Sequence, residues 1–113
     1  MKDLTDLAKE VAAANAANGF WDESENSLII PTKLALIHDE VSEALQAHRD
    51  NYDGPEKEAG MTSEQEAEFA EELADIIIRT LDLAGHYGFP IGEILEDKLD
   101  KNRSRPAKHG KRY

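Results

Sequence analysis

The sequence predicts an all-α protein that folds as one domain of four helices over residues 1–113. The length of 113 residues suits a single domain. Helix-forming residues dominate the chain, and apolar residues recur every three or four positions, as on one face of a helix, rather than alternating as in a strand. There is no cysteine, which excludes disulfides, cysteine-ligated zinc and thiolate catalysis.

The first two helices are expected on either side of a loop. The first should cover about residues 5–18, because its apolar residues have helical spacing. Gly19 is the expected stop, since glycine readily adopts the left-handed conformation that ends many helices. The second helix should begin near Pro31 or Thr32, because proline is tolerated in a first turn, and it should end near residue 51.

A charged stretch with few apolar residues separates the second helix from the third, and we expect a flexible loop or a short helical insert there. The third helix should begin where Ser63 and Glu66 have the spacing of a capping box, and it should run to Tyr87. Gly88 should end it. The fourth helix should cover about residues 91–102.

Two pairs of acidic residues lie at the border of the predicted core. Glu40 falls among the apolar residues of the second helix, and Glu43 lies about 60° to one edge of them. On the third helix, Glu72 and Asp75 repeat this arrangement with the same spacing. A single pair of this kind is common on a solvated helix edge, but two pairs in the same register predict that four carboxylates converge.

Converging carboxylates need a compensating charge. Two of them about 5 Å apart repel by about 3 kcal/mol at an effective dielectric of about 20, so the cluster would otherwise destabilise the bundle or take up protons. A divalent cation removes this repulsion, and oxygen ligands on rigid helices suit Mg²⁺, with Mn²⁺ as a substitute. The predicted metal ligands are Glu40, Glu43, Glu72 and Asp75.

The fourth helix carries groups of the opposite character. Lys98 and Asn102 are four residues apart and border its apolar stripe, so that a cation and an amide donor could bind phosphate. The alternative is that the lysine stem covers apolar surface and that Asn102 caps the helix. The pattern alone does not separate these two interpretations.

The acid pairs and the later lysine occur in a fixed order along the chain. Glu-Val-Ser-Glu at 40–43 is followed by 28 residues, by Glu-Leu-Ala-Asp at 72–75 and by the step from Lys98 to Asn102. This order resembles the MazG-like all-α nucleotide pyrophosphohydrolases, from about residue 31 to the C-terminus. The resemblance implies an oligomeric four-helix fold, either a dimer or a tetramer. It also implies bound Mg²⁺ and cleavage of (deoxy)nucleoside triphosphates to monophosphate and pyrophosphate, in nucleotide pool control or housecleaning.

The resemblance also implies roles for individual residues. By position, Lys98 and Asn102 would be phosphate contacts. The metal-binding and catalytic carboxylates would be Glu40, Glu43, Glu72 and Asp75. A water activated by Mg²⁺ would attack the α-phosphorus, with either Glu40 or Glu43 as the base. Phe20 and Trp21 could stack on the nucleotide base, but anchoring of the core or of an oligomer interface explains these two aromatics equally well.

The segment from residue 103 to residue 113 is basic, whereas the rest of the chain is acidic. It holds five basic residues and no acid, and the rest holds 8 basic against 24 acidic residues. Composition alone would make this segment a solvated tail, but a proline and a glycine within it favour a structured turn. We therefore expect Arg105, Lys108 and Lys111 to fold over a site of their own or a neighbouring subunit and to meet the charge of the triphosphate.

The overall charge and hydropathy limit the partners. A net charge of −11 would repel a polyanion, which argues against nucleic acid as a partner. No apolar run approaches the roughly 18 residues of a membrane span, and the N-terminus lacks the hydrophobic segment of a signal peptide. A cytoplasmic protein that binds no membrane is therefore expected.

Two other classes of protein compete with the enzyme hypothesis. A non-catalytic acidic oligomerisation or interaction module would pair its acid borders with the basic tail, would be stable without metal and would turn over no substrate. A ferritin-like diiron bundle requires Glu-x-x-His pairs, which this sequence lacks.

Overall fold

The computed structural model describes residues 3–21, 28–51 and 62–105. Within these ranges the chain forms helices and no strand, which confirms the all-α fold class. The helices are α1 (Leu4–Ala17), α2 (Ile29–Asn51), α3 (Ser63–Tyr87) and α4 (Ile91–Arg103). Of these helices, none combines the length and the apolar character that a membrane crossing requires.

Glycines follow α1 and α3, as the sequence predicts. Gly19 has a φ of 83° and Gly88 a φ of 71°, both in the left-handed region that residues with a Cβ seldom adopt. At the end of α3, Phe89 N donates to the Ala84 carbonyl, so a carbonyl in the last turn is satisfied.

Three predicted helix ends need correction. α2 begins at Ile29 rather than near Pro31 or Thr32, so Pro31 is its third residue. Proline is harmless there because the first N–H groups of a helix have no acceptor within it. The capping box lies one residue earlier than predicted: Thr62 Oγ1 accepts from Gln65 N at 3.3 Å, and Gln65 Oε1 accepts from Thr62 N at 2.8 Å. α4 extends one residue further than predicted, to Arg103.

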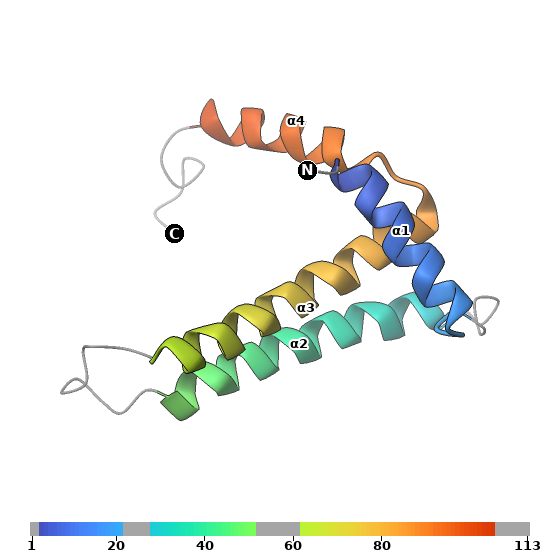
Figure 1. Ribbon diagram of the computed structural model, residues 1–113. Helices are drawn as coiled ribbons and strands as arrows, with labels where there is room; N and C mark the ends of the chain where they lie inside the picture. Colours follow the sequence, from blue (N-terminus) through green and yellow to red (C-terminus); the bar gives the residue numbers. More distant parts are fainter. Residues whose placement is uncertain (1–2, 22–27, 52–61, 106–113) are drawn as a thin grey trace.

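α3 is the central helix. It packs against both α1 and α2. Figure 1 shows α2 and α3 side by side and antiparallel, with α1 lying across the end of the pair where α3 finishes. The carboxylate pairs of α2 and α3 are therefore held on two adjoining helices.

A glycine allows α1 to lie close to α3. A Cβ added at Gly85 would be 2.1 Å from the carbonyl oxygen of Ala8, so a larger residue would force the helices apart. Ala8 is completely buried at this crossing, and Leu81 and Ala84 pack with it. Small residues thus fix the distance between the two backbones.

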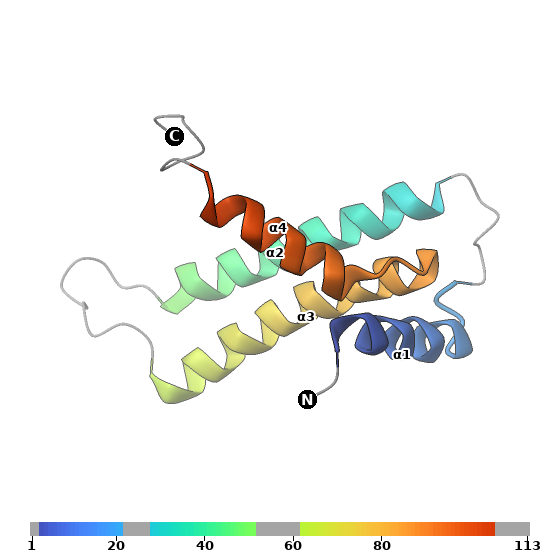
Figure 2. The same cartoon turned by 90° about the horizontal axis from the view of Figure 1, so that it is seen from above.

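α4 contacts α1; in Figure 1 it runs back above the α2–α3 pair, and in the view of Figure 2 it crosses over that pair. Its first turn is fixed to α1 by a hydrogen bond from Gly92 N to Thr5 Oγ1, 2.9 Å long. Among the described residues, no large side chain is fully buried. Large apolar side chains remain exposed on three helices: Leu34, Val41, Leu45, Leu73, Ile77, Ile78, Ile94, Leu95 and Leu99. One chain alone therefore leaves much of its predicted apolar stripes uncovered.

Candidate metal centre and the pocket beside it

Three of the four predicted carboxylates come together. Glu40 and Glu43 on α2 and Glu72 on α3 each place a carboxylate oxygen within 4.8 Å of the others. Glu40 and Glu43 are three residues apart, so both point from the same face of α2 toward α3. This is why their spacing in the sequence predicted that they converge. Asp75 lies one turn after Glu72 and, with Glu40, lines a neighbouring pocket.

The cluster has carboxylate oxygens that are free to bind a cation. Glu40 is buried, and its Oε2 and the Oε2 of Glu72 have no hydrogen-bond partner among the described residues. Leaving such oxygens unpaired is costly. In an octahedral Mg²⁺ site, ligand oxygens lie about 3 to 4 Å from one another, so small side-chain rotations would fit these carboxylates to the ion. The residues present therefore suit a hard divalent cation.

The electrostatics of the cluster agree with this view. Repulsion from the Glu40 carboxylate raises the pKa of Glu43, and the charges of Glu72 and Asp39 add to the effect. A like-charged cluster is the situation for which the sequence predicts a compensating cation.

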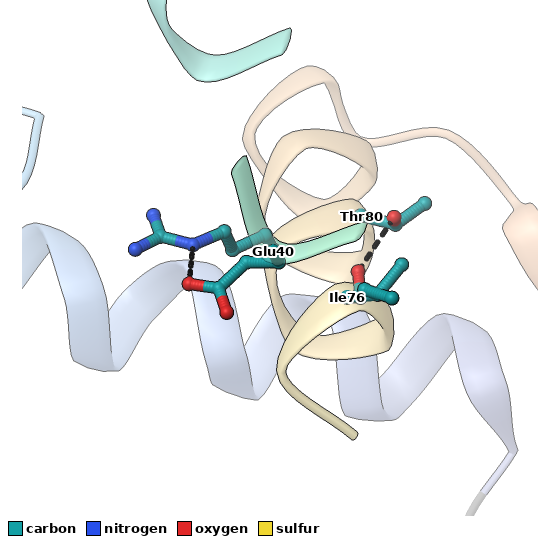
Figure 3. Close-up of polar contacts among 4 residues, drawn as sticks. Glu40, Ile76 and Thr80 are labelled. Carbon is teal, nitrogen blue, oxygen red and sulfur yellow. Dashed lines mark hydrogen bonds and ion pairs between the residues drawn. The ribbon is translucent and has the colours of Figure 1, made fainter. Parts of the chain in front are cut away.

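Part of that compensation comes from the chain itself. Arg79 Nε donates to Glu40 Oε1 at 2.8 Å. Figure 3 shows the bond that Glu40 accepts, and also the bond from Thr80 Oγ1 to the carbonyl of Ile76 one turn back on α3, 2.8 Å long. The Thr80 hydroxyl thus has its acceptor within its own helix, whereas Arg79 donates to a carboxylate of the acidic cluster on α2.

A pocket of about 450 Å³ lies beside the carboxylates. Glu40, Asp75 and Arg79 contribute to its wall, and Asn15 and Phe20 reach it from α1 and the turn that follows. Ligand pockets for small molecules have volumes of about 300–1,000 Å³, so a nucleotide is of suitable size. The pocket therefore joins the acidic cluster to groups that could contact a base.

The two adjacent aromatics have different surroundings. Trp21 is buried, and its Nε1 donates to Asp82 Oδ1 at 2.8 Å. His86 stacks on its ring, with centroids 3.7 Å apart, and Lys33 Nζ lies 4.5 Å from the ring centre. Phe20 is 57% exposed and lines the pocket. Trp21 thus anchors the turn to α3, while Phe20 is the aromatic that faces the pocket.

The structure does not bring the predicted phosphate contacts of α4 to the carboxylates. Lys98 lines a second, apolar groove of about 460 Å³ between α3 and α4, together with Ile76, Ile77 and Thr80. At about 100° per residue, these three α3 residues lie about 100° to 200° around the helix axis from Asp75, although Ile76 is only about 40° from Glu72. Within one chain, Lys98 therefore lines a different pocket from the one beside the acidic cluster.

The remaining predicted phosphate contacts are exposed or lie beyond the described ranges. Asn102, in the last turn of α4, and Arg105, just after it, are both exposed. Lys108 and Lys111, with the rest of the expected basic turn, are outside the described residues.

Sequence reasoning missed the partners of Glu40 and Trp21. Arg79 and Asp82 follow Asp75 by four and seven residues, about one and two turns, and so lie on the same side of α3. A buried indole N–H requires an acceptor, so Trp21 was a signal that a polar partner existed. Nothing in the sequence indicated which acid would supply it.

Comparison with known proteins gave one match. The profile of the MazG-like family matches residues 36–113, which is more than half of the chain and includes both acid pairs. Neither the search of curated proteins nor the search of solved structures found a match.

Proposed function

The chain belongs to the MazG-like family, and on this premise we propose that it hydrolyses (deoxy)nucleoside triphosphates to nucleoside monophosphate and pyrophosphate with Mg²⁺. One observation carries the proposal: Glu40 and Glu72, each with a buried carboxylate oxygen that has no hydrogen-bond partner among the described residues, come together from two helices. A pocket large enough for a nucleotide adjoins them. A structural acid edge would require neither feature.

Glu40, Glu43 and Glu72 would hold Mg²⁺, with Asp75 as a further ligand one turn away. When bound, Mg²⁺ supplies charge neutralisation of the triphosphate and makes water easier to deprotonate. Either Glu40 or Glu43 would be the base that takes a proton from the attacking water; repulsion from Glu40 raises the pKa of Glu43, but a bound cation would offset that repulsion, so both remain candidates.

The pocket supports a binding mode for the rest of the substrate. Phe20 would stack on the base, and the Asn15 amide, which also lines the pocket, would donate or accept a hydrogen bond there. Lys33 Nζ donates to the Phe20 carbonyl at 2.8 Å and so keeps this turn beside the pocket. Trp21 would act indirectly, through its bond to Asp82.

We further propose that the functional unit contains at least two chains. The radius of gyration is 17.5 Å, against about 13 Å for a compact chain of this length. The groove beside α4 is almost entirely apolar, and Ile77, Ile94 and Leu95 are exposed at it. A second copy would cover these residues. In such an assembly Lys98 and Asn102 would bind the phosphates of a substrate held at the carboxylates of the neighbouring chain.

The decisive experiment is incubation with a panel of nucleoside triphosphates, with and without Mg²⁺, followed by identification of the products. We expect metal-dependent release of pyrophosphate and monophosphate. Orthophosphate and nucleoside diphosphate as primary products would contradict the proposed reaction.

Metal-linked stability separates the enzyme from the non-catalytic module. Because Mg²⁺ should bind the folded cluster better than the unfolded chain, it should raise the melting temperature. Glu72→Gln should weaken this response, and Glu71→Gln, a neighbouring exposed acid, should not. The same melting temperature in EDTA and in millimolar Mg²⁺, without turnover of any substrate, would favour the oligomerisation module.

A further inference from the structure

The ion pair between Arg79 and Glu40 is incomplete. A guanidinium has five N–H donors and often binds a carboxylate with two parallel hydrogen bonds. Here the contact runs through Nε alone, and Glu40 Oε2 keeps no partner among the described residues. The geometry is that of a side-on contact, in which the terminal nitrogens of the guanidinium are not used for Glu40.

The arginine also lies where a ligand could reach it. The Arg79 side chain is 40% exposed, whereas that of Glu40 is 11% exposed. Both residues line the pocket of about 450 Å³. The buried member of the pair belongs to the acidic cluster, and the accessible member presents a cation to the pocket.

A divalent cation at the cluster would change the balance of this pair. In the structure, Arg79 is the positive group paired with Glu40. A cation held by Glu40, Glu43 and Glu72 would take over that neutralisation and repel the guanidinium. A polyphosphate entering the pocket would offer Arg79 several anionic oxygens, which suit its planar fork better than the single contact to Glu40 does.

We infer that Arg79 exchanges partners: it neutralises Glu40 in the metal-free protein and binds the triphosphate directly once the metal is in place. This inference rests on the proposed function. It makes Arg79 a substrate-contacting residue that pattern reasoning did not select. Lys98 lines the other groove, so Arg79 is the basic group that α3 itself would supply to the triphosphate.

The inference predicts opposite changes in two binding constants for Arg79→Gln. Mg²⁺ alone, titrated calorimetrically, should bind the variant several-fold more tightly than the original protein, because a competing cation has been removed from Glu40. Inorganic tripolyphosphate in excess Mg²⁺, a probe that does not depend on the base, should bind about 10- to 100-fold more weakly. The value of kcat/KM should fall about 10²-fold.

Two further variants sharpen this test. Arg79→Lys keeps the charge without the fork, so it should retain the Mg²⁺ affinity of the original protein and recover only part of the tripolyphosphate affinity. Arg49→Gln removes an exposed arginine from the last turn of α2 and should leave both affinities unchanged. Melting curves in Mg²⁺ check that each variant is folded.

A purely structural arginine gives a different result. Arg79→Gln would then lower the melting temperature with and without Mg²⁺, and the folded variant would bind tripolyphosphate as the original protein does; that result overturns the inference. If the original protein hydrolyses triphosphates but Arg79→Gln retains its kcat/KM, only the role of Arg79 is wrong. If the original protein neither binds Mg²⁺ nor turns over any triphosphate, the proposed function is wrong and this inference falls with it.

Discussion

The two sides of α3 differ in how many of their side chains find partners within a single chain. On the side with polar contacts, Arg79 donates to Glu40 on α2, and Asp82 accepts from Trp21 in the turn after α1. On the side toward α4, Ile76 and Ile77 line an apolar groove that α4 leaves open. The first side carries charged groups, including carboxylate oxygens of Glu40 and Glu72 that have no partner among the described residues, whereas the second exposes apolar side chains. On the proposed function, the first side would bind metal and substrate and the second would bind another copy of the chain.

The largest effect should come from removing a carboxylate on the polar side. Glu72→Gln should lower kcat/KM by at least about 10³-fold at saturating Mg²⁺, because it removes charge from the cluster that holds the ion. Glu71→Gln has the same chemistry on an exposed neighbour and should retain activity. Steady-state kinetics of both variants measure the difference, and equal activities would place the metal elsewhere.

Mixing two inactive variants tests whether the two sides cooperate between chains. Glu40→Gln lacks a ligand on one side, and Lys98→Ala lacks the cation on the other. If each site combines both chains of a dimer, equal mixing should restore about a quarter of the original activity, since half of the dimers are mixed and each has one intact site. The control is each variant mixed with itself. No restoration after verified subunit exchange would show that Lys98 does not act across chains.

A charge placed on the apolar side should weaken self-association. Leu95→Glu puts a carboxylate into the groove beside α4, where burial against a second copy would be costly. We expect a lower mass in sedimentation equilibrium and a melting temperature reduced by several degrees. Glu93→Gln, an exposed change in the first turn of α4, is the matched control. An unchanged mass would mean that another surface forms the oligomer or that the chain is monomeric.

The smallest effect concerns the anchor on the polar side. Trp21→Phe keeps an aromatic ring but removes the donor to Asp82, leaving a buried carboxylate without that partner. The cost should be about 1–3 kcal/mol of unfolding free energy, measured by urea denaturation. If the loss is nearer zero while the Michaelis constant rises, the bond positions the pocket rather than stabilising the fold.

The sequence predicts helix ends well where one residue type decides them. Gly19 and Gly88 adopt the left-handed conformation that few other residues tolerate, so their role can be read directly. The predicted capping box is one residue too late because two pairs, Thr62 with Gln65 and Ser63 with Glu66, both have the required spacing. Only the hydrogen-bond geometry shows which pair forms it. The start of α2 was placed late because proline is acceptable at several first-turn positions.

The same distinction applies to the site. Periodicity indicates the direction of a side chain around its helix, which is enough to predict that Glu40 is buried and converges with Glu43 and Glu72. It does not say which residue lies opposite, so the pairing of Glu40 with Arg79 required the structure. Nor does it fix the path of α4, which depends on contacts with α1. Periodicity therefore could not predict the position of Lys98.

The link between α3 and α4 consists of residues 88–90. Three residues span at most about 11 Å when fully extended, about the diameter of one helix with its side chains. The link is thus short enough that α4 must begin within about one helix diameter of the end of α3. On the proposed two-chain arrangement, a chain without a neighbour lacks Lys98 at its carboxylates. Activity per molecule would then rise with protein concentration, because a larger fraction of the chains would be assembled.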